Sequence, residues 1–330
     1  MVWRGHPAGP ETARAGDPVT ISVFVPSYRR PTLLRNCLAA LTRQSRPADE
    51  VVVTLRDSDL ESRKVVEEFQ SRLPLRLALV AIPGPMPAYN RGVTEVTGDI
   101  VCITDDDAEP FPDWIERIER RFAQEPSLGA VGGRDHVHVD GVPQATRAVS
   151  RVGIIQWFGR TIGNHSHDAV GARNVDILKG CNMALRTDQP IRFDERLRGD
   201  AYHMEVGICL AVKRAGFGIL FDPEIRVNHY LGPRQPGADR LGLAPERLSA
   251  NGFNHVLVVM PHFPLWRRIA FLIWTFAIGD QTAPGLVRGL FLCKGRLHEL
   301  PGILLPAQRG KLEGLKTWRA GRTLSRAGAL

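Results

Sequence analysis

Residues 100–107 of this 330-residue chain are Ile100-Val-Cys-Ile-Thr-Asp-Asp-Asp107, an apolar run that ends in three carboxylates. A short apolar segment without alternating polar residues is typical of a strand buried on both faces of a parallel sheet. Ligands bind such sheets beyond the carboxyl ends of the strands. Because residues i and i+2 of an extended chain point the same way, Asp105 and Asp107 are expected to face one site.

Similar apolar runs alternate with helical patterns outward from this stretch. We expect strands at residues 21–25, 50–54, 77–82 and 100–104, and helices that begin at residue 31 and span 61–73, 89–96 and 112–124. This order predicts the α/β fold class, with a mostly parallel, Rossmann-like sheet and helices on both faces.

The composition divides the chain into three parts. Residues 1–19 are rich in Pro, Gly, Ala and Arg and predict a flexible leader. Residues 20–250 are expected to form the α/β domain, in which the Pro/Gly-rich residues 231–249 predict a mobile loop or a linker. Residues 251–330 predict a basic, amphipathic helical extension.

The net charge of +8 is confined to the C-terminal end. Residues 261–330 contain 11 Lys and Arg against 3 Asp and Glu, so residues 1–260 carry no net charge. A nucleic-acid partner is not expected, because such proteins carry basic stripes with interleaved aromatic residues or a recognisable module. Residues 261–330 are expected either to lie on an anionic membrane surface or to pack on the α/β domain with solvated basic faces.

Several classes of protein are disfavoured by missing motifs. The five cysteines are widely spaced without a CxxC, which indicates a reducing compartment rather than a disulfide framework. No run reaches the ~18 apolar residues of a membrane-spanning helix. The absence of G-x-G-x-x-G after the first strand and of a Walker motif argues against a dinucleotide-binding dehydrogenase and a P-loop NTPase. The pairs His136/His138 and His165/His167 lack a further cluster for a structural zinc site.

Polar residues follow the other expected strands as well. Carboxylates there are able to accept hydrogen bonds from a nucleoside base or ribose, or to cap the following helix. Two carboxylates with open positions suit Mg²⁺ or Mn²⁺ completed by substrate phosphates. The residues at these strand ends are Pro26, Ser27 and Tyr28, then Arg56, Asp57 and Asp59, then Asn90 and Arg91.

Together these segments resemble family 2 glycosyltransferases, which have the GT-A fold, from about Ile21 to Leu231. The resemblance rests on the opening strand and turn, an Asp-x-Asp metal motif, an Ala-Arg-Asn-x-Gly-like segment, a Gly-x-Asn-Met-like segment, and an acidic helix start. The opening strand and turn are Val25 to Arg30, and the metal motif is Asp105 to Asp107. The Ala-Arg-Asn-x-Gly-like segment is Ala88 to Gly92, and the Gly-x-Asn-Met-like segment is Leu178 to Ala184. The acidic helix start is Phe193-Asp194-Glu195 followed by Glu205.

The resemblance implies an inverting transfer of a sugar from a nucleotide-diphosphate sugar to a hydroxyl of a saccharide or lipid-linked acceptor. It further implies Mn²⁺ or Mg²⁺, a role in cell-envelope polysaccharide or glycolipid synthesis, and a location in the cytoplasm or on the inner face of the cell membrane. The nucleotide-binding half is expected at about 20–135 and the acceptor half at about 136–250.

The family's residue roles carry over as follows. Glu205 is the expected general base. Gly180, Asn182 and His165 are expected on the acceptor side. Asp107, Asp105 and His229 are expected to hold the metal. The donor is expected to contact Pro26, Ser27, Tyr28, Arg30, Arg56, Asp57, Asp59, Asn90, Arg91, Asp105 and Asp106.

Two segments depart from the family pattern. Leu55 to Asp59 replace the usual Asp-Asp-Gly-Ser, and His203-Met204-Glu205 replace the usual Glu-Asp pair.

Two alternatives to a glycosyltransferase stay open. A metal-dependent nucleotidyltransferase would release pyrophosphate instead of a nucleoside diphosphate, and a non-catalytic nucleotide-sugar or nucleic-acid binding protein would lack the base.

Overall fold

The computed structural model describes residues 19–189, 191–231, 243–293 and 295–327. Residues 1–18 of the expected leader and residues 232–242 of the expected loop lie outside the described residues. All five cysteines are buried and free of disulfides.

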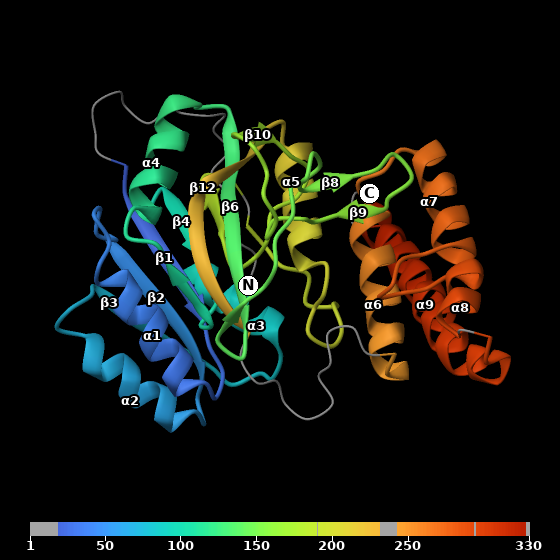
Figure 1. Ribbon diagram of the computed structural model, residues 1–330, viewed down its shortest axis with the longest axis horizontal. Coiled ribbons are helices and arrows are strands. Elements are labelled where there is room, and N and C mark those ends of the chain that lie inside the picture. Colours follow the sequence, from blue (N-terminus) through green and yellow to red (C-terminus); the bar gives the residue numbers. More distant parts are fainter. Residues whose placement is uncertain (1–18, 190, 232–242, 294, 328–330) are drawn as a thin grey trace.

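One sheet runs through the α/β domain (Figure 1). Its order is β10-β12-β6-β11-β4-β1-β2-β3. The strands β3, β2, β1 and β4 are parallel, whereas β11 lies antiparallel between β4 and β6. The bounds are β1 Ile21–Pro26, β2 Glu50–Arg56, β3 Leu75–Val80, β4 Ile100–Ile103, β6 Leu128–Val139, β10 Arg173–Asn174, β11 Met183–Arg186 and β12 Gly218–Leu231.

Short strands complete this arrangement. β5 (Ala108–Pro110) pairs with β12 and β7 (Val142–Pro143) pairs with β6, while β8 (Ile154–Ile155) and β9 (Thr161–Ile162) form a separate hairpin. The expected fold class, a mostly parallel sheet with helices on both faces, is confirmed.

Alternation along each strand divides the core into two clusters. Val23 of β1 faces α1 (Pro31–Leu41), α2 (Leu60–Phe69) and α4 (Trp114–Gln124). Phe24, the next residue, faces α3 (Pro85–Glu95) and α5 (Met204–Arg214) on the opposite side. The central strands β1, β2 and β4 therefore bury both of their faces, as their continuous apolar sequences require, whereas the outer strand β3 is partly exposed.

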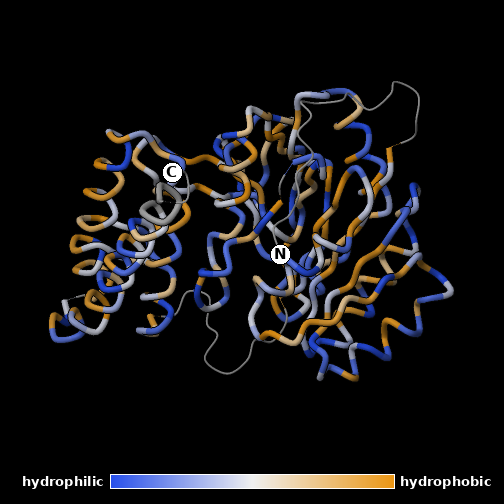
Figure 2. The backbone as a smooth tube through the Cα atoms, turned by 180° about the vertical axis from the view of Figure 1, so that it is seen from behind, coloured by the Kyte–Doolittle hydropathy of each residue, from blue (hydrophilic) through white to orange (hydrophobic). Residues whose placement is uncertain are grey.

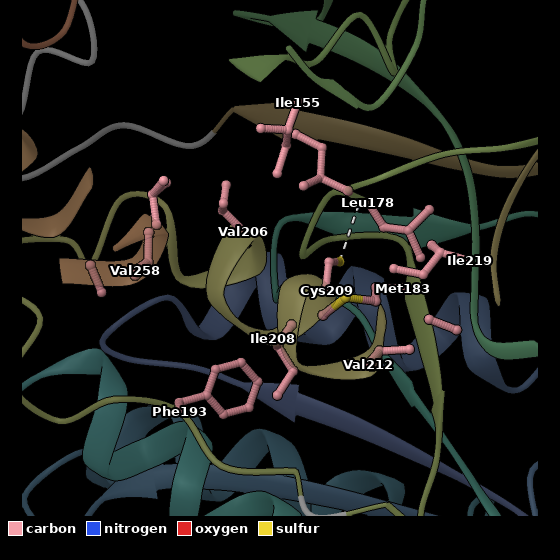
Figure 3. Packing of buried hydrophobic residues seen from close by; sticks show 14 of the residues in the cluster. Ile155, Leu178, Met183, Phe193, Val206, Ile208, Cys209, Val212, Ile219 and Val258 are labelled. Carbon is pink, nitrogen blue, oxygen red and sulfur yellow. Dashed lines mark hydrogen bonds between the residues drawn. The ribbon is translucent and has the colours of Figure 1, made fainter. Parts of the chain in front are cut away.

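Helix α5 carries the expected base and is fixed by its apolar face. Figure 3 shows Val206, Ile208, Cys209 and Val212 of α5 packed among buried side chains of the sheet and of α6. Cys209 Sγ accepts a weak hydrogen bond from the backbone N–H of Leu178 (3.4 Å). This packing holds the first turn of α5 in place.

The C-terminal part consists of α6 (Pro245–Val259), α7 (Leu265–Ala277), α8 (Leu286–Leu292), a short 3₁₀ turn η1 (Leu297–Glu299) and α9 (Leu300–Ala327). The expected boundary after residue 250 falls inside α6, so the extension begins earlier than its composition suggests. Phe253, Phe271 and Trp318 belong to the same core cluster as Phe24. These helices therefore pack against the α/β domain. Among the described residues, none of the helices has the length and hydropathy needed to cross a bilayer.

Candidate functional site

The carboxyl ends of β1, β2 and β4 meet at one edge of the sheet, because the three strands are parallel and in register. Asp105, Asp106 and Asp107 follow β4 at this edge. His229 of β12 pairs there with Ala108 of β5, and the N-terminus of α5 brings Glu205 to the same place. We call this group the strand-edge site.

Asp106 points back toward the loop after β1. Its carboxylate accepts hydrogen bonds from Ser27 Oγ (2.7 Å) and Arg30 Nη1 (2.9 Å). Burial raises the pKa of Asp106 to about 7, with Asp107 acting in the same direction and Arg30 and Ser27 opposing it. Asp106 thus joins β4 to the β1 loop, and three of the expected donor residues contact one another.

Asp107 faces a buried histidine. Asp107 Oδ1 lies 3.3 Å from His229 Nε2, and Arg30 Nη1 donates to Asp107 Oδ2 at 3.2 Å. On its other side, His229 Nδ1 lies 3.4 Å from Asp135 Oδ2, which also forms an ion pair with Lys179. A ring protonated on both nitrogens donates Nδ1–H toward Asp135 and Nε2–H toward Asp107, whereas a bound metal would take the lone pair of Nε2.

Asp135 and His229 perturb one another. Burial alone would raise the pKa of Asp135, but Lys179 and His229 hold it below its usual range. Burial alone would lower the pKa of His229, and its neighbours, among them Cys181, Asp107 and Asp135, reverse this and raise it. The ring is thus held in place by charge on both sides.

Asp105 lies beside the expected base. Tyr89 Oη donates to Asp105 Oδ1 (3.2 Å). Burial raises the pKa of Glu205, and the negative charge of Asp105 acts in the same direction. Backbone N–H groups of Glu205 and Gly180 oppose this shift by hydrogen bonding to the carboxylate. A Cβ on residue 180 would lie 3.1 Å from Glu205 Oε1, so a glycine leaves room for the carboxylate.

The strand-edge site fits a divalent cation. Ligand atoms of Asp105, Cys181 and His229 all lie within 4.8 Å of one another, and Asp107 adjoins His229. Carboxylate oxygens suit Mg²⁺ and Mn²⁺ alike, whereas an imidazole nitrogen suits a transition metal better. The carboxylate behind His229 is the partner that metal-bound histidines commonly have. The carboxylate and imidazole groups of this set therefore suit a divalent cation such as Mn²⁺ or Mg²⁺.

A second cluster of potential ligands, His203, His255 and Asp280, lies between α5, α6 and the segment after α7. Its two imidazole rings are stacked, with centroids 4.4 Å apart and planes at 20°. An ion in the plane of one ring would lie outside the plane of the other, so this arrangement does not suit a bound metal.

Of the carboxylates after β2, one is committed to the backbone. Asp59 is the N-cap of α2, where Oδ1 accepts from Ser62 N (3.2 Å) and Oδ2 accepts from Arg29 N (2.5 Å). The capping alternative therefore holds for Asp59, whose two carboxylate oxygens both accept from backbone N–H groups, and its donor contact stays a prediction. Asp57 is exposed, and its Oδ1 lies 3.8 Å from Nε of the partly exposed Arg56 in a long ion pair.

Four other predicted contacts are not supported by the side-chain positions. Asn90 bonds to Phe193 and Glu195, and Arg91 pairs with Glu95 at 2.7 Å. Asn182 is fully buried and bonded to Trp114, Arg134 and Ile225. His165 is buried, with Nε2 bonded to Ile177 O, and burial lowers its pKa to about 4. Both side chains are used inside the core, and the acceptor-side roles of Asn182 and His165 stay predictions.

The strand-edge site also contains residues to which the sequence assigned no role. Asp135, Lys179, Cys181 and Tyr89 all touch the predicted metal or base residues. Asp135 lies within β6, where a lone acid in a strand carries no sequence signal of its own. Lys179 and Cys181 lie in the Gly-x-Asn-Met-like segment, which was the available signal.

The sheet order and the carboxylates at its edge define an α/β protein of the GT-A class. TarS 1–349 from S. aureus, solved with UDP-GlcNAc, has the same fold at a TM-score of 0.58 and 15% identity, covering 94% of this chain and 92% of that one. The mannosyltransferase PcManGT from Pyrobaculum calidifontis, solved with GDP-Man and Mn²⁺, aligns at a TM-score of 0.54 and 17% identity, covering 91% and 88%.

The family model for glycosyl transferase family 2 matches residues 22–188, and the chain belongs to this family. The probable glycosyltransferase YdaM of Bacillus subtilis is 24% identical over 62% of this chain and 49% of its own length. The amylovoran biosynthesis glycosyltransferase AmsB of Erwinia amylovora is 23% identical over 66% of this chain and 71% of its own. The chain thus spans about half of YdaM and 26% of the chondroitin synthase of Escherichia coli.

Proposed function

We propose that the protein transfers a sugar from a nucleotide-diphosphate sugar to an acceptor hydroxyl with inversion. One observation carries this proposal: Glu205 lies beside Asp105, and Asp107 faces His229, at the edge of the sheet where ligands bind. A base and an anion-compensating group are what a single displacement at an anomeric carbon needs. Relatives named as glycosyltransferases favour this reaction over nucleotidyl transfer.

Glu205 is the proposed general base. Its carboxylate is held by two backbone N–H groups at the start of α5, so it is oriented before an acceptor binds. The acceptor oxygen gives its proton to Glu205 while it forms a bond to the anomeric carbon. The bond from that carbon to the donor phosphate breaks, and its electron pair leaves with the nucleoside diphosphate. Attack from the side opposite the leaving group inverts the configuration.

Asp105, Asp107 and His229 are the proposed metal residues, with Cys181 beside them. A bound Mn²⁺ or Mg²⁺ would neutralise charge that develops on the departing diphosphate. The chain itself adds Arg30, whose guanidinium already contacts Asp106 and Asp107. Asp57 and Arg56 are the proposed contacts to the nucleoside.

Replacement of Asp107 by Asn tests the metal assignment. We expect Asp107→Asn to bind Mn²⁺ more weakly and to lose most nucleoside diphosphate release, because a carboxylate ligand becomes a neutral amide. The wild type is first screened against a panel of nucleotide sugars with Mn²⁺ or Mg²⁺, with and without acceptors. The exposed Asp140→Asn is the matched control. Full activity in Asp107→Asn, or release of pyrophosphate by the wild type, would contradict the proposal.

The C-terminal helices are the proposed contact with an anionic membrane surface. Among the residues whose side chains the structure describes, 12 of the 22 exposed large apolar ones lie between residues 265 and 312, within the segment that holds the whole net charge. Figure 2 shows hydrophobic and hydrophilic stretches alternating along these helices. An apolar face with basic flanks fits the interface of an anionic bilayer. A peripheral position on the inner face of the cell membrane, a lipid-linked or saccharide acceptor, and a role in envelope polysaccharide or glycolipid synthesis follow as proposals.

A further inference from the structure

We propose that a second pocket, which shares no residue with the strand-edge site, binds the phosphate group of an anionic lipid. The pocket lies between residues 147–151 and the β8–β9 hairpin, outside the C-terminal segment 261–330. Its cavity measures about 590 Å³. We call it the arginine pocket, after Arg147, Arg151 and Arg160, which line it.

The charge of the arginine pocket is entirely positive. No Asp or Glu lines it, and the hydroxyls of Ser150 and Thr161 add neutral donors. Guanidinium groups are the side chains best suited to phosphate, because they donate two parallel hydrogen bonds. Three arginines that line one cavity would favour an anion with several oxygens.

None of the three arginines forms an ion pair or a side-chain hydrogen bond with another residue in the described part of the chain. Neighbouring arginines behave differently. Arg134 pairs with Asp168 at 2.7 Å, and Arg173 Nη1 donates to Ser150 O at 2.9 Å. Arg134 and Arg173 thus make the ion pair and the backbone hydrogen bond of this region, and the side chains of the pocket arginines remain available to a ligand.

The backbone that carries the pocket arginines is held by hydrogen bonds. Gln156 N donates to Arg160 O (2.9 Å), and Gly153 N donates to Gly163 O (2.8 Å) across the hairpin. Asn164 Nδ2 donates to Arg151 O (2.9 Å). Because the backbone is ordered before a ligand arrives, binding needs only the side chains to settle.

The surroundings of the pocket indicate a lipid as the source of the phosphate. The same hairpin carries Trp157, whose ring stacks on Trp266 of α7 with centroids 6.4 Å apart. Arg267 Nε ties the two elements together by donating to Trp157 O (2.8 Å). Trp157 and Trp266 are 59% and 60% exposed, although indoles are costly to leave in water.

Helix α7 extends this apolar surface. Leu265, Ile269 and Ile273, one helical turn apart, are 70%, 51% and 65% exposed. We call these three residues with Trp157 and Trp266 the α7 patch. Tryptophan and aliphatic side chains beside basic groups are typical of the headgroup region of a bilayer. A lipid that places its phosphate in the arginine pocket would present its acyl region to the α7 patch.

The test compares two full-length triple variants with equal loss of charge. R147Q/R151Q/R160Q empties the pocket of positive charge, and R43Q/R63Q/R120Q removes three exposed arginines of the α/β domain. Binding is measured by cosedimentation with vesicles of four parts phosphatidylcholine to one part phosphatidic acid. We expect the pocket variant to bind roughly tenfold to hundredfold more weakly and the control to bind like wild type.

The assay contains neither nucleotide sugar nor metal, so its outcome is separate from that of the transfer reaction. Thermal melting checks folding, which exposed arginines should not affect. Equal losses in both variants, or no loss in the pocket variant, would overturn the proposal. Inorganic phosphate serves as the soluble probe. If it binds wild type but not the pocket variant, while vesicle binding is equal, the ligand is a soluble phosphate and the lipid assignment is wrong.

Discussion

Asp105, Asp106 and Asp107 are adjacent in sequence but have separate surroundings. Asp106 is bonded to Ser27 and Arg30 of the β1 loop, Asp105 accepts from Tyr89, and Asp107 faces His229. The three residues lie in a turn after β4, closed by the N–H of Ala108 donating to Asp105 O (3.1 Å), and Asp106 and Asp107 share Arg30 Nη1. The same carboxylate chemistry therefore serves to join two loops at one position and to face a ligand at the two others.

Glu205→Gln tests the base at this scale. The amide keeps the size of the side chain but accepts no proton, so we expect kcat to fall by about 10²–10⁴-fold with little change in the donor KM. Because burial and Asp105 raise the pKa of Glu205, activity of the wild type should be lost on the acid side at a pH above the usual range of a glutamate. Initial rates across pH measure both effects.

The control for this variant is Glu224→Gln, at an exposed glutamate between the two halves of β12. It should keep wild-type rates and the wild-type pH profile. A Glu205→Gln enzyme with an unchanged rate, or an acid limb at the position of an exposed glutamate, would show that the base lies elsewhere.

Asn182→Ala tests a residue that the family pattern suggested for the acceptor side. Its amide accepts from Trp114 Nε1 (2.8 Å) and donates to Arg134 O (3.1 Å) and Ile225 O (2.9 Å). Removal leaves buried polar groups unpaired, so we expect the free energy of unfolding to fall by about 3 kcal/mol. Denaturant unfolding measures it. Asn174→Ala, at an exposed strand position, should be near neutral, and a stable Asn182→Ala with a raised acceptor KM would support the acceptor role.

At the scale of elements, periodicity predicts what is local. The strands β1 to β4 and helices α1 to α4 occur where apolar runs and helical stripes predict them, within about two residues except at two helix ends. Helix α3 begins four residues early at Pro85, and α2 ends four residues early at Phe69. The long strand β6 was not predicted, because Gly132 and Gly133 interrupt its pattern. A Cβ at residue 133 would lie 1.8 Å from Ile225 O, so Gly133 permits the close approach of β12, while a Cβ at residue 132 would lie 2.5 Å from Asn182 O.

The residues of the strand-edge site could be predicted from the sequence where they belong to a recognisable motif. Asp105, Asp107 and His229 are brought together across strands, as the Asp-x-Asp pattern and the lone histidine suggested. The sequence did not distinguish Asp59 as a helix cap or Asn182 as a core residue. Asp and Asn serve caps, cores and ligands through the same hydrogen-bonding groups, and only the three-dimensional partners separate these uses.

Buried histidines make the packing of these elements sensitive to acid. Burial lowers the pKa of His165 to about 4 and that of His203 to about 3. Their folded pKa values lie below the unfolded value near 6.5, so the unfolded chain binds more protons as pH falls from about 6.5 to 4 and stability falls with it. We expect each to cost about 2 kcal/mol at pH 5 relative to pH 7. Unfolding midpoints in denaturant between pH 7 and 5 measure this.

A single substitution isolates one histidine. His165→Gln retains an amide donor for Ile177 O but cannot titrate, so it should flatten the pH dependence by about one proton. His298→Gln, at an exposed position of η1, should leave the slope as in wild type. Equal slopes in all three proteins would mean that His165 is not the source of the acid sensitivity.

At the scale of the whole molecule, the charge of +8 separates from the strand-edge site. Residues 1–260 are neutral and hold the carboxylates at the sheet edge, whereas residues 261–330 carry the whole excess. The structure adds what composition does not contain, namely which apolar side chains of α7, α8 and α9 face outward. For residues 261–330, packing on the α/β domain and contact with a membrane surface are therefore compatible. These helices pack on the α/β domain with one face and leave apolar groups exposed on another.

The exposed face gives the last prediction. L265S/I269S/I273S removes apolar area from α7 without touching its packed side, so we expect unchanged melting and unchanged transfer to a soluble acceptor. Binding to anionic vesicles should weaken roughly tenfold or more, because apolar area no longer enters the interface. L60S/L79S/I82S changes three exposed side chains on the α/β domain and is the matched control. Flotation with vesicles at low and high salt separates the apolar from the charge contribution. If the two variants bind equally well, the exposed face of α7 does not contact the membrane.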